Sequence, residues 1–197
     1  MYDLLIKGGT VVDPSQIIHG INDVAIEDGK IARIAPNISA EEAGRVVEVK
    51  GKVVISGLID LHTHVYAGVN GNGVDPDLGG VRAGVTTMVD AGSSGCDTFG
   101  GFPLHIIPNT STEIICFLHI CRTGLATSPD IFSPSSIDLD KTIQVISDNR
   151  GVISGVKARM VSPALEIMGM EMPRMAKRAA KEAGVKLMVH IGDTEKR

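Results

Sequence analysis

The sequence predicts an α/β protein in which a small all-β module precedes a larger unit built on parallel strands. Residues 1–53 consist of short runs of β-branched and aliphatic residues separated by glycine-containing turns. From residue 54 onward, buried apolar strands alternate with helical or irregular stretches, which is the pattern of a parallel α/β architecture. We therefore expect two domains, residues 1–53 and residues 54–197.

Three turns are expected to fold residues 1–53 into antiparallel hairpins. They lie at Gly8-Gly9, Asp28-Gly29 and Lys50-Gly51-Lys52, each between two apolar runs. An Asp-Gly pair flanked by β-branched residues is a strong hairpin signal, because the type I′ turn needs positive φ angles. The first domain is thus predicted to be a small all-β module of short antiparallel strands.

Five strands are predicted in the second domain. They cover residues 53–61, 86–91, 113–120, 152–160 and 186–191. Between the last two, residues 173–183 place methionine and alanine at helical spacing, and Gly184 follows where a glycine often ends a helix. Each strand feeds a loop at its carboxyl end, where α/β enzymes build their sites.

Composition excludes several classes of partner. The net charge is −4 and aromatic residues make up 3%, which argues against nucleic acid or an anionic membrane as the main partner. No apolar stretch is long enough to span a bilayer, and the N-terminus lacks the features of a signal peptide, so a cytoplasmic location is expected. The three cysteines have no recognisable spacing, which fits reduced, structural thiols.

The first candidate site is the sequence Asp60-Leu61-His62-Thr63-His64, at the end of an apolar run. Side chains alternate between the two faces of a strand, so Asp60, His62 and His64 are expected on the same face. Two imidazoles directed at one point make a metal site, provided that other strands bring further ligands. The alternative is that either histidine is a hydrogen-bonded core residue.

Lys157 and His190 end two later apolar runs. Burying an ammonium group without a partner costs several kcal/mol, so Lys157 is expected either to form a salt bridge or face outward, or to have a lowered pKa. If the pKa of Lys157 is lowered, CO₂ can carboxylate the amine to a carbamate, an anion that offers one oxygen to each of two divalent cations. His190 is either a ligand of the second cation or a core histidine bonded to a backbone carbonyl.

The order of motifs in this chain resembles that of the amidohydrolase superfamily of metal-dependent hydrolases. A small β module is followed by a strand that ends in His-x-His, a strand that carries a lysine and a strand that ends in a histidine. The resemblance is strongest to the dihydroorotase-like amidohydrolase and deacetylase group. The segments that carry the resemblance are residues 2–13, 57–64, 73–77, 84–95, 155–159 and 189–193. It implies a partial (β/α)8 TIM barrel, with about five of the eight strands in this chain, preceded by part of a small β-sandwich subdomain.

The same resemblance assigns the candidate residues to roles. His62 and His64 would hold the more buried of two divalent metal ions, carbamylated Lys157 would bridge both ions, and His190 would hold the more exposed one. Zinc is expected, with manganese, iron or cobalt as alternatives. The family also requires a further histidine and a general-base aspartate, which the resemblance places beyond residue 197.

Other residues near the strand ends have weaker signals. Asp60 is a candidate for orienting a metal ligand, and Asp90 and Arg159 are candidates for substrate contact. His119, inside the third strand, has no partner that the sequence supplies. The segment Ser93-Ser94-Gly95 lies where a substrate loop is expected, but it is interpreted as a plain turn.

The expected function is metal-dependent hydrolysis of an amide or ester bond in an acylated amino acid-like or hydroxy-acid compound. The alternatives are a hydrolase of a cyclic amide such as dihydroorotate, and a non-catalytic scaffold. The expected partner is a small-molecule substrate, and the full-length protein is expected to be a homo-oligomer. The 197-residue chain by itself is expected to be an N-terminal fragment without hydrolase activity.

Overall fold

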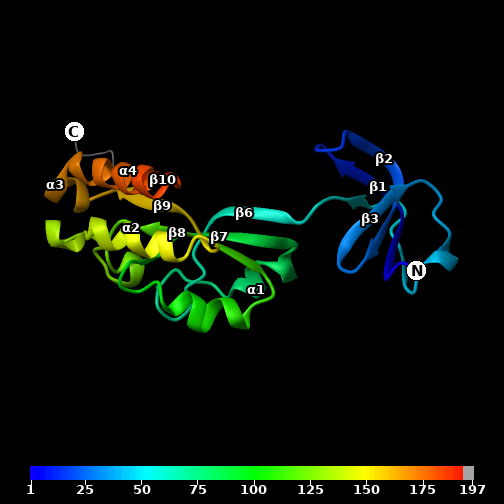
Figure 1. Ribbon diagram of the computed structural model, residues 1–197, viewed down its shortest axis with the longest axis horizontal. Helices are drawn as coiled ribbons and strands as arrows, with labels where there is room; N and C mark the ends of the chain where they lie inside the picture. The colour runs from blue at the N-terminus through cyan, green and yellow to red at the C-terminus, as the bar shows by residue number, and fades with distance from the viewer. Residues whose placement is uncertain (193–197) are drawn as a thin grey trace. The chain divides into compact units, whose positions relative to one another are not determined.

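The computed structural model describes residues 1–192 (Figure 1). The chain divides into two compact units, Met1–Ser56 and Gly57–Arg197. Within the described residues, no helix is both long and apolar enough to span a membrane.

The first unit is a five-stranded sheet. Its strands are β1 (Leu4–Asp13), β2 (Ile18–Glu27), β3 (Lys30–Ala35), β4 (Val46–Glu48) and β5 (Val53–Val54). The order is β3-β2-β1-β4, and β5 also pairs with β1. Strands β1, β2 and β3 are antiparallel neighbours, whereas β4 and β5 both run parallel to β1.

One of the three predicted hairpin turns is confirmed. Asp28 and Gly29 join β2 to β3 with φ angles of 51° and 70°. The other two predictions are wrong. At Gly8-Gly9 the chain does not reverse, because β1 continues through an irregularity in its pairing with β2 between Ile6 and Gly9. After Gly51 the chain does not reverse either, since β4 and β5 pair in succession along the same strand β1.

The second unit is a parallel sheet. Its strands are β6 (Leu58–Thr63), β7 (Val85–Gly95), β8 (Glu113–His119), β9 (Ile153–Met160) and β10 (Lys186–Ile191). Their order in the sheet, β10-β9-β8-β7-β6, follows the order in the chain, as in part of a (β/α)8 barrel. The predicted strand 53–61 is corrected: its beginning is β5 of the first unit, and β6 starts only after residue 57.

The connections between these strands differ in length and regularity. The helices are α1 (Pro76–Gly79), α2 (Leu139–Asp148), α3 (Ala164–Met168) and α4 (Glu171–Ala183). The predicted helix 173–183 is confirmed as α4, which begins two residues earlier and ends at Gly184 in the left-handed conformation. The connection from β7 to β8 has only short irregular turns of helix between residues 102 and 109.

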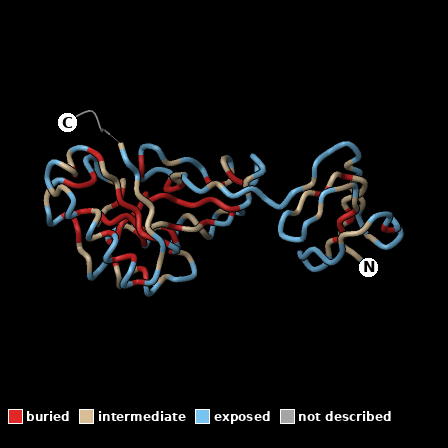
Figure 2. Tube along the Cα trace, turned by 90° about the horizontal axis from the view of Figure 1, so that it is seen from above, coloured by how far each residue is buried: buried red, intermediate tan, exposed pale blue. Residues whose placement is uncertain are grey.

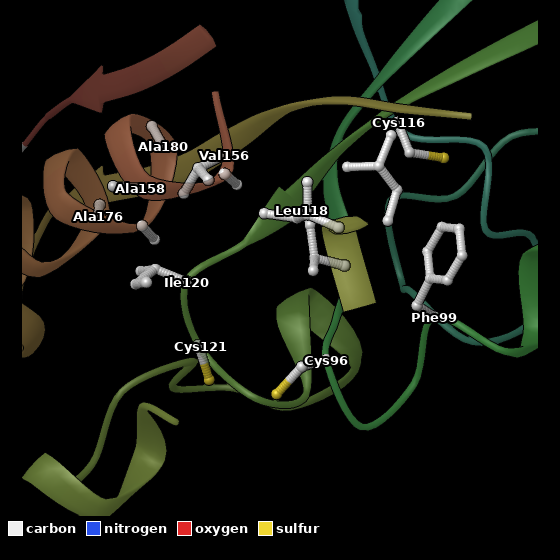
Figure 3. Packing of buried hydrophobic residues seen from close by; sticks show 14 of the residues in the cluster. Cys96, Phe99, Cys116, Leu118, Ile120, Cys121, Val156, Ala158, Ala176 and Ala180 are labelled. Atoms are coloured by element: carbon white, nitrogen blue, oxygen red, sulfur yellow. The ribbon is translucent and has the colours of Figure 1, made fainter. Parts of the chain in front are cut away.

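The core of the second unit lies between the sheet and its helices. Buried residues concentrate along the strands of this unit in Figure 2. Leu118, Val156 and Ala158 on the sheet pack in one cluster with Ala176 and Ala180 of α4 (Figure 3). Because these helix residues are small, α4 approaches the sheet closely, and this packing fixes β9 and β10 and thus the side chains at their carboxyl ends.

Candidate active-site pocket

The carboxyl ends of the parallel strands surround a cavity of about 750 Å³. Five of the residues singled out from the sequence line it: His62, His64, Lys157, Arg159 and His190. They come from β6 and the residue after it, from β9 and from β10, so segments more than a hundred residues apart in the chain meet here. The strand-end pattern in the sequence therefore identified one pocket.

The three histidines of the pocket lie close to one another. The ring of His62 stands edge-on to His64, with 5.7 Å between their centroids, and to His190, with 6.4 Å. Burial lowers the pKa of His64 to about 4, and the charges of His62 and Lys157 act in the same direction. Burial, followed by the charge of Lys157, also lowers the pKa of His62. Both imidazoles are therefore neutral at neutral pH, which is the form that binds a metal ion.

Lys157 is buried on β9, between β10 and β8, with 1% of its surface exposed. Its Nζ lies 3.3 Å from His62 Nε2 and 3.4 Å from Met188 Sδ. Among the described residues, no ion pair joins Lys157 to a carboxylate, and its side chain is buried, so the structure contradicts both the ion-paired and the outward-facing alternatives. Burial, with the charge of Arg159 as the second cause, lowers the pKa of Lys157 to about 8. A fraction of the amine is thus neutral near neutral pH, and the neutral amine is the form that reacts with CO₂.

Gly92 makes the space that the Lys157 side chain occupies. It lies within β7 with a φ angle of 88°, and a Cβ atom at this position would lie 2.7 Å from Lys157 Cγ and 3.0 Å from His119 Cδ2. Any larger residue would therefore collide with the lysine or with its neighbour on β8. The glycine is a requirement of the site rather than of a turn.

His119 and Asp130, of which Asp130 lines the pocket, are neighbours that the sequence did not reveal as partners. His119 is opposite Lys157 in the register of β8 and β9 and is completely buried. Its Nδ1 accepts the Cys121 N–H at 2.9 Å, so its proton is on Nε2, which lies 3.3 Å from Asp130 Oδ2 without the geometry of a hydrogen bond. The same oxygen lies 3.4 Å from Arg159 Nη1. In the sequence, the only signal for His119 was a histidine inside an apolar strand.

Burial and the mutual electrostatic interactions of His119, Asp130 and Arg159 shift the pKa values of His119 and Asp130. Burial lowers the pKa of His119, against the opposing effect of Asp130. For Asp130, burial acts to raise the pKa, but His119 and Arg159 outweigh it and the pKa is lowered. Asp130 is therefore an anion that partly balances the guanidinium of Arg159 at the edge of the pocket.

The two candidate aspartates are placed differently from the other candidates, since neither lines the pocket. Asp60 Oδ1 accepts the backbone N–H of His62 at 3.0 Å. Asp90 is buried, and its carboxylate accepts the backbone N–H groups of Val65 at 2.8 Å and Ser93 at 2.7 Å. Burial raises the pKa of Asp90. Both aspartates thus accept hydrogen bonds from the backbone of, or next to, the candidate ligands His62 and His64.

The donor set of the pocket suits divalent metal ions. Imidazole nitrogen is a common ligand of zinc, and a carbamate on Lys157 would add anionic oxygens. Among residues 1–192, no three His, Cys, Asp or Glu side chains are close enough to hold a metal ion by themselves. A modified Lys157 would supply the missing anionic ligand, and its Nζ lies 3.3 Å from His62 Nε2, beside another candidate ligand.

No protein-family model matches the chain. It is 32% identical over 169 residues to a deacetylase of Agrobacterium fabrum, an alignment that covers 84% of this chain and 42% of the relative. It is 29% identical over 192 residues to a deacetylase of Enterococcus faecalis, covering 97% of this chain and 50% of that protein. A crystal structure of a dihydroorotase superposes with a TM-score of 0.86 at 29% identity, covering 98% of this chain and 52% of that one. The chain thus spans about half the length of these proteins.

Proposed function

Because this chain belongs to the amidohydrolase superfamily, we propose that the complete protein is a hydrolase that cleaves an amide or ester bond with the help of divalent metal ions. Relatives named deacetylase support this proposal, and matches named dihydroorotase keep a cyclic-amide substrate as the alternative. The proposal concerns the complete protein, since the chain spans only part of its relatives.

The observation that carries the proposal is the state of Lys157. A buried lysine without an anionic partner destabilises a fold, unless the amine is neutral or modified. Here the amine lies on the wall of a pocket, next to an imidazole whose pKa is lowered. A carbamate would convert this unfavourable cation into an anion beside metal-binding histidines. This modification would remove the cost of burying Lys157 as an unpaired cation.

We propose that His62, His64, carbamylated Lys157 and His190 hold two metal ions. We further propose zinc as the metal, with manganese, iron or cobalt as alternatives. When bound, the ions would polarise the scissile carbonyl and lower the pKa of a water molecule toward neutrality. The chain's own contribution is to bring three imidazoles to one pocket and to lower the pKa of two of them, His62 and His64.

The cationic edge of the pocket favours an acidic substrate. Arg159 lines the pocket, and within residues 1–192 its one ion pair is with Asp130, a carboxylate that also lies beside His119. A guanidinium that is only partly neutralised can pair with a substrate carboxylate. We propose an acylated amino acid or acylated hydroxy acid as the substrate, in a cytoplasmic protein that forms homo-oligomers.

The proposal is tested on the complete protein with three groups of substrates: N-acetyl amino acids, O-acetyl hydroxy acids and dihydroorotate. We expect hydrolysis in at least one of the acetylated groups, its loss after chelation, and its return with zinc or manganese. Activity on dihydroorotate alone would favour the alternative. Absence of hydrolysis together with substoichiometric metal would support the scaffold interpretation and contradict the proposal.

A further inference from the structure

We propose that Asp130 is a positioning residue that fixes the guanidinium of Arg159, so that Arg159 can bind the carboxylate of the substrate. The inference rests on the proposed function only for the identity of that substrate. It starts from one carboxylate oxygen, Asp130 Oδ2, which lies 3.4 Å from Arg159 Nη1 and 3.3 Å from His119 Nε2.

The loop after β8 holds Asp130 in a fixed place. The thiol of Cys121 donates to the backbone carbonyl of Asp130 at 2.6 Å, and the next residue, Ile131, is completely buried. Asp130 itself is 3% exposed and lines the pocket. Its carboxylate therefore reaches the pocket wall from a backbone that is anchored in the core.

Arg159 is the neighbour of Asp130 that always carries a charge. A buried carboxylate needs a compensating cation or hydrogen-bond donors, and the guanidinium supplies both. Within residues 1–192, Asp130 is also the one hydrogen-bond acceptor of the Arg159 side chain. The position of the guanidinium therefore depends on Asp130.

The rest of the guanidinium is available to a ligand. A guanidinium has several N–H donors in one plane, and the contact with Asp130 uses only Nη1. The Arg159 side chain is 31% exposed and lines the pocket. Held at one nitrogen, it can present its remaining donors to a carboxylate, the anion whose shape matches the arginine fork.

The place of Arg159 on β9 puts a bound carboxylate beside the candidate metal ligands. Arg159 follows Lys157 by two residues, so both side chains leave the same face of the strand. Its register partner on β10 is His190. A substrate held at Arg159 by its carboxylate would thus have its acyl group close to these ligands, which suits an acid that is acylated near its carboxylate.

Removing the charge of Asp130 has two opposite effects on the binding of an acid. Without the anion the edge of the pocket becomes more positive, which by itself would lower KM. A released arginine side chain, however, must be ordered again when the substrate binds, and this ordering weakens binding by about two- to tenfold. The positioning role therefore predicts a higher KM, whereas a role as counter-charge alone predicts a lower one.

The first test measures steady-state kinetics of the complete protein on a matched pair of substrates. The pair consists of an acetylated acid that the protein hydrolyses and the same molecule with a carboxamide in place of the carboxylate. Asp130→Asn should raise KM for the acid by about two- to tenfold and leave its kcat and the hydrolysis of the carboxamide unchanged. The matched control is Asp97→Asn, which changes an aspartate that pairs with Arg122 and is not among the residues that line the pocket; it should affect neither substrate.

A double variant shows whether Asp130 acts through Arg159. In an Arg159→Met protein, the further change Asp130→Asn should not raise KM for the acid again, because no guanidinium is left to position. The same effect of Asp130→Asn with and without Arg159 would overturn the inference. So would a lower KM for the acid in the single variant, or an equal rise for the acid and the carboxamide.

Crystal structures of the complete protein test the contact without any activity. In the wild-type protein, Arg159 Nη1 should lie within hydrogen-bond distance of the Asp130 carboxylate. In Asp130→Asn, which keeps the volume of the side chain, the guanidinium should be displaced or poorly ordered. An unchanged guanidinium in the variant would overturn the inference, and so would a wild-type guanidinium turned away from Asp130, even if the variant did not fold.

The two proposals fail in different ways. If the complete protein hydrolyses no acetylated acid, the proposed function fails, and the crystal structures still decide whether Asp130 positions Arg159. If the protein hydrolyses an acetylated acid but Asp130→Asn changes the acid and the carboxamide alike, the proposed function stands and the positioning role of Asp130 fails.

Discussion

Replacing Gly92 with alanine should destabilise the second unit and disturb the position of Lys157. The φ angle of 88° makes any side chain unfavourable, at a cost of about 1–2 kcal/mol. The new Cβ would also lie 2.7 Å from Lys157 Cγ and 2.9 Å from Lys157 Cβ, and overpacking of this kind costs about 1–3 kcal/mol. We therefore expect the free energy of unfolding to fall by about 2–5 kcal/mol in total.

The matched control for this experiment is Gly84→Ala. Gly84 lies in the same unit with a φ angle of 86°, but a Cβ at this position would meet no atom within 4 Å. Only the backbone cost of about 1–2 kcal/mol should remain. Urea unfolding of the complete protein, followed by far-UV circular dichroism, measures both variants. Equal losses of stability in the two variants would refute the claim that Gly92 makes room for Lys157.

Three further predictions concern the pocket. Lys157→Ala should abolish the two-metal site, with partial recovery of activity in acetate or bicarbonate; full activity without additives would contradict a bridging carbamate. In a His190→Asn variant, graded chelation followed by metal counting should show that the ion at His62 and His64 is retained. The reason is that these ligands lie two residues apart in the chain and His64 is partly buried. Loss of all metal at the lowest chelator dose would contradict two separate metal sites. Arg159→Met should raise KM for carboxylate-bearing substrates by about tenfold or more, as expected for a lost charge-assisted hydrogen bond, and an unchanged KM would remove Arg159 from substrate binding.

The parallel unit was largely predictable because its strands are buried apolar runs with clear ends. The predicted strand 186–191 coincides with β10, and the predicted helix 173–183 lies within α4. The first unit was less predictable, since a glycine turn does not show whether the chain reverses. Strands β4 and β5 both pair with β1, which lies about 40 residues earlier in the chain. This pairing is a tertiary contact, and the local sequence contains no signal for it.

The site could be predicted where a candidate metal ligand lies at the end of a strand. His62, His64, Lys157 and His190 all follow apolar runs, and the structure brings them into one pocket. The supporting residues were not predictable in this way. Ser93 Oγ lies beside His64 Nδ1 and accepts a hydrogen bond from Asn70, and the Ser93 backbone N–H donates to the buried Asp90. None of these contacts can be deduced from residue spacing.

His119 shows a second limit of the sequence. Its position opposite Lys157 depends on the register between β8 and β9, which contains an irregularity between Cys116 and Phe117. Its neighbour Asp130 lies in the loop that follows β8, outside any regular element. The register of parallel strands that are distant in the chain is fixed by packing, so the sequence alone does not give this pair.

The metal content of the complete protein tests the central claim most directly. The protein is purified without chelators in the presence of bicarbonate, and its metals are counted by mass spectrometry of the digested sample. The account predicts about two divalent ions per chain in the wild-type protein, because the proposed site combines three imidazoles with a carbamate on Lys157. A wild-type protein that holds well under one ion per chain, even after incubation with zinc and bicarbonate, would contradict it.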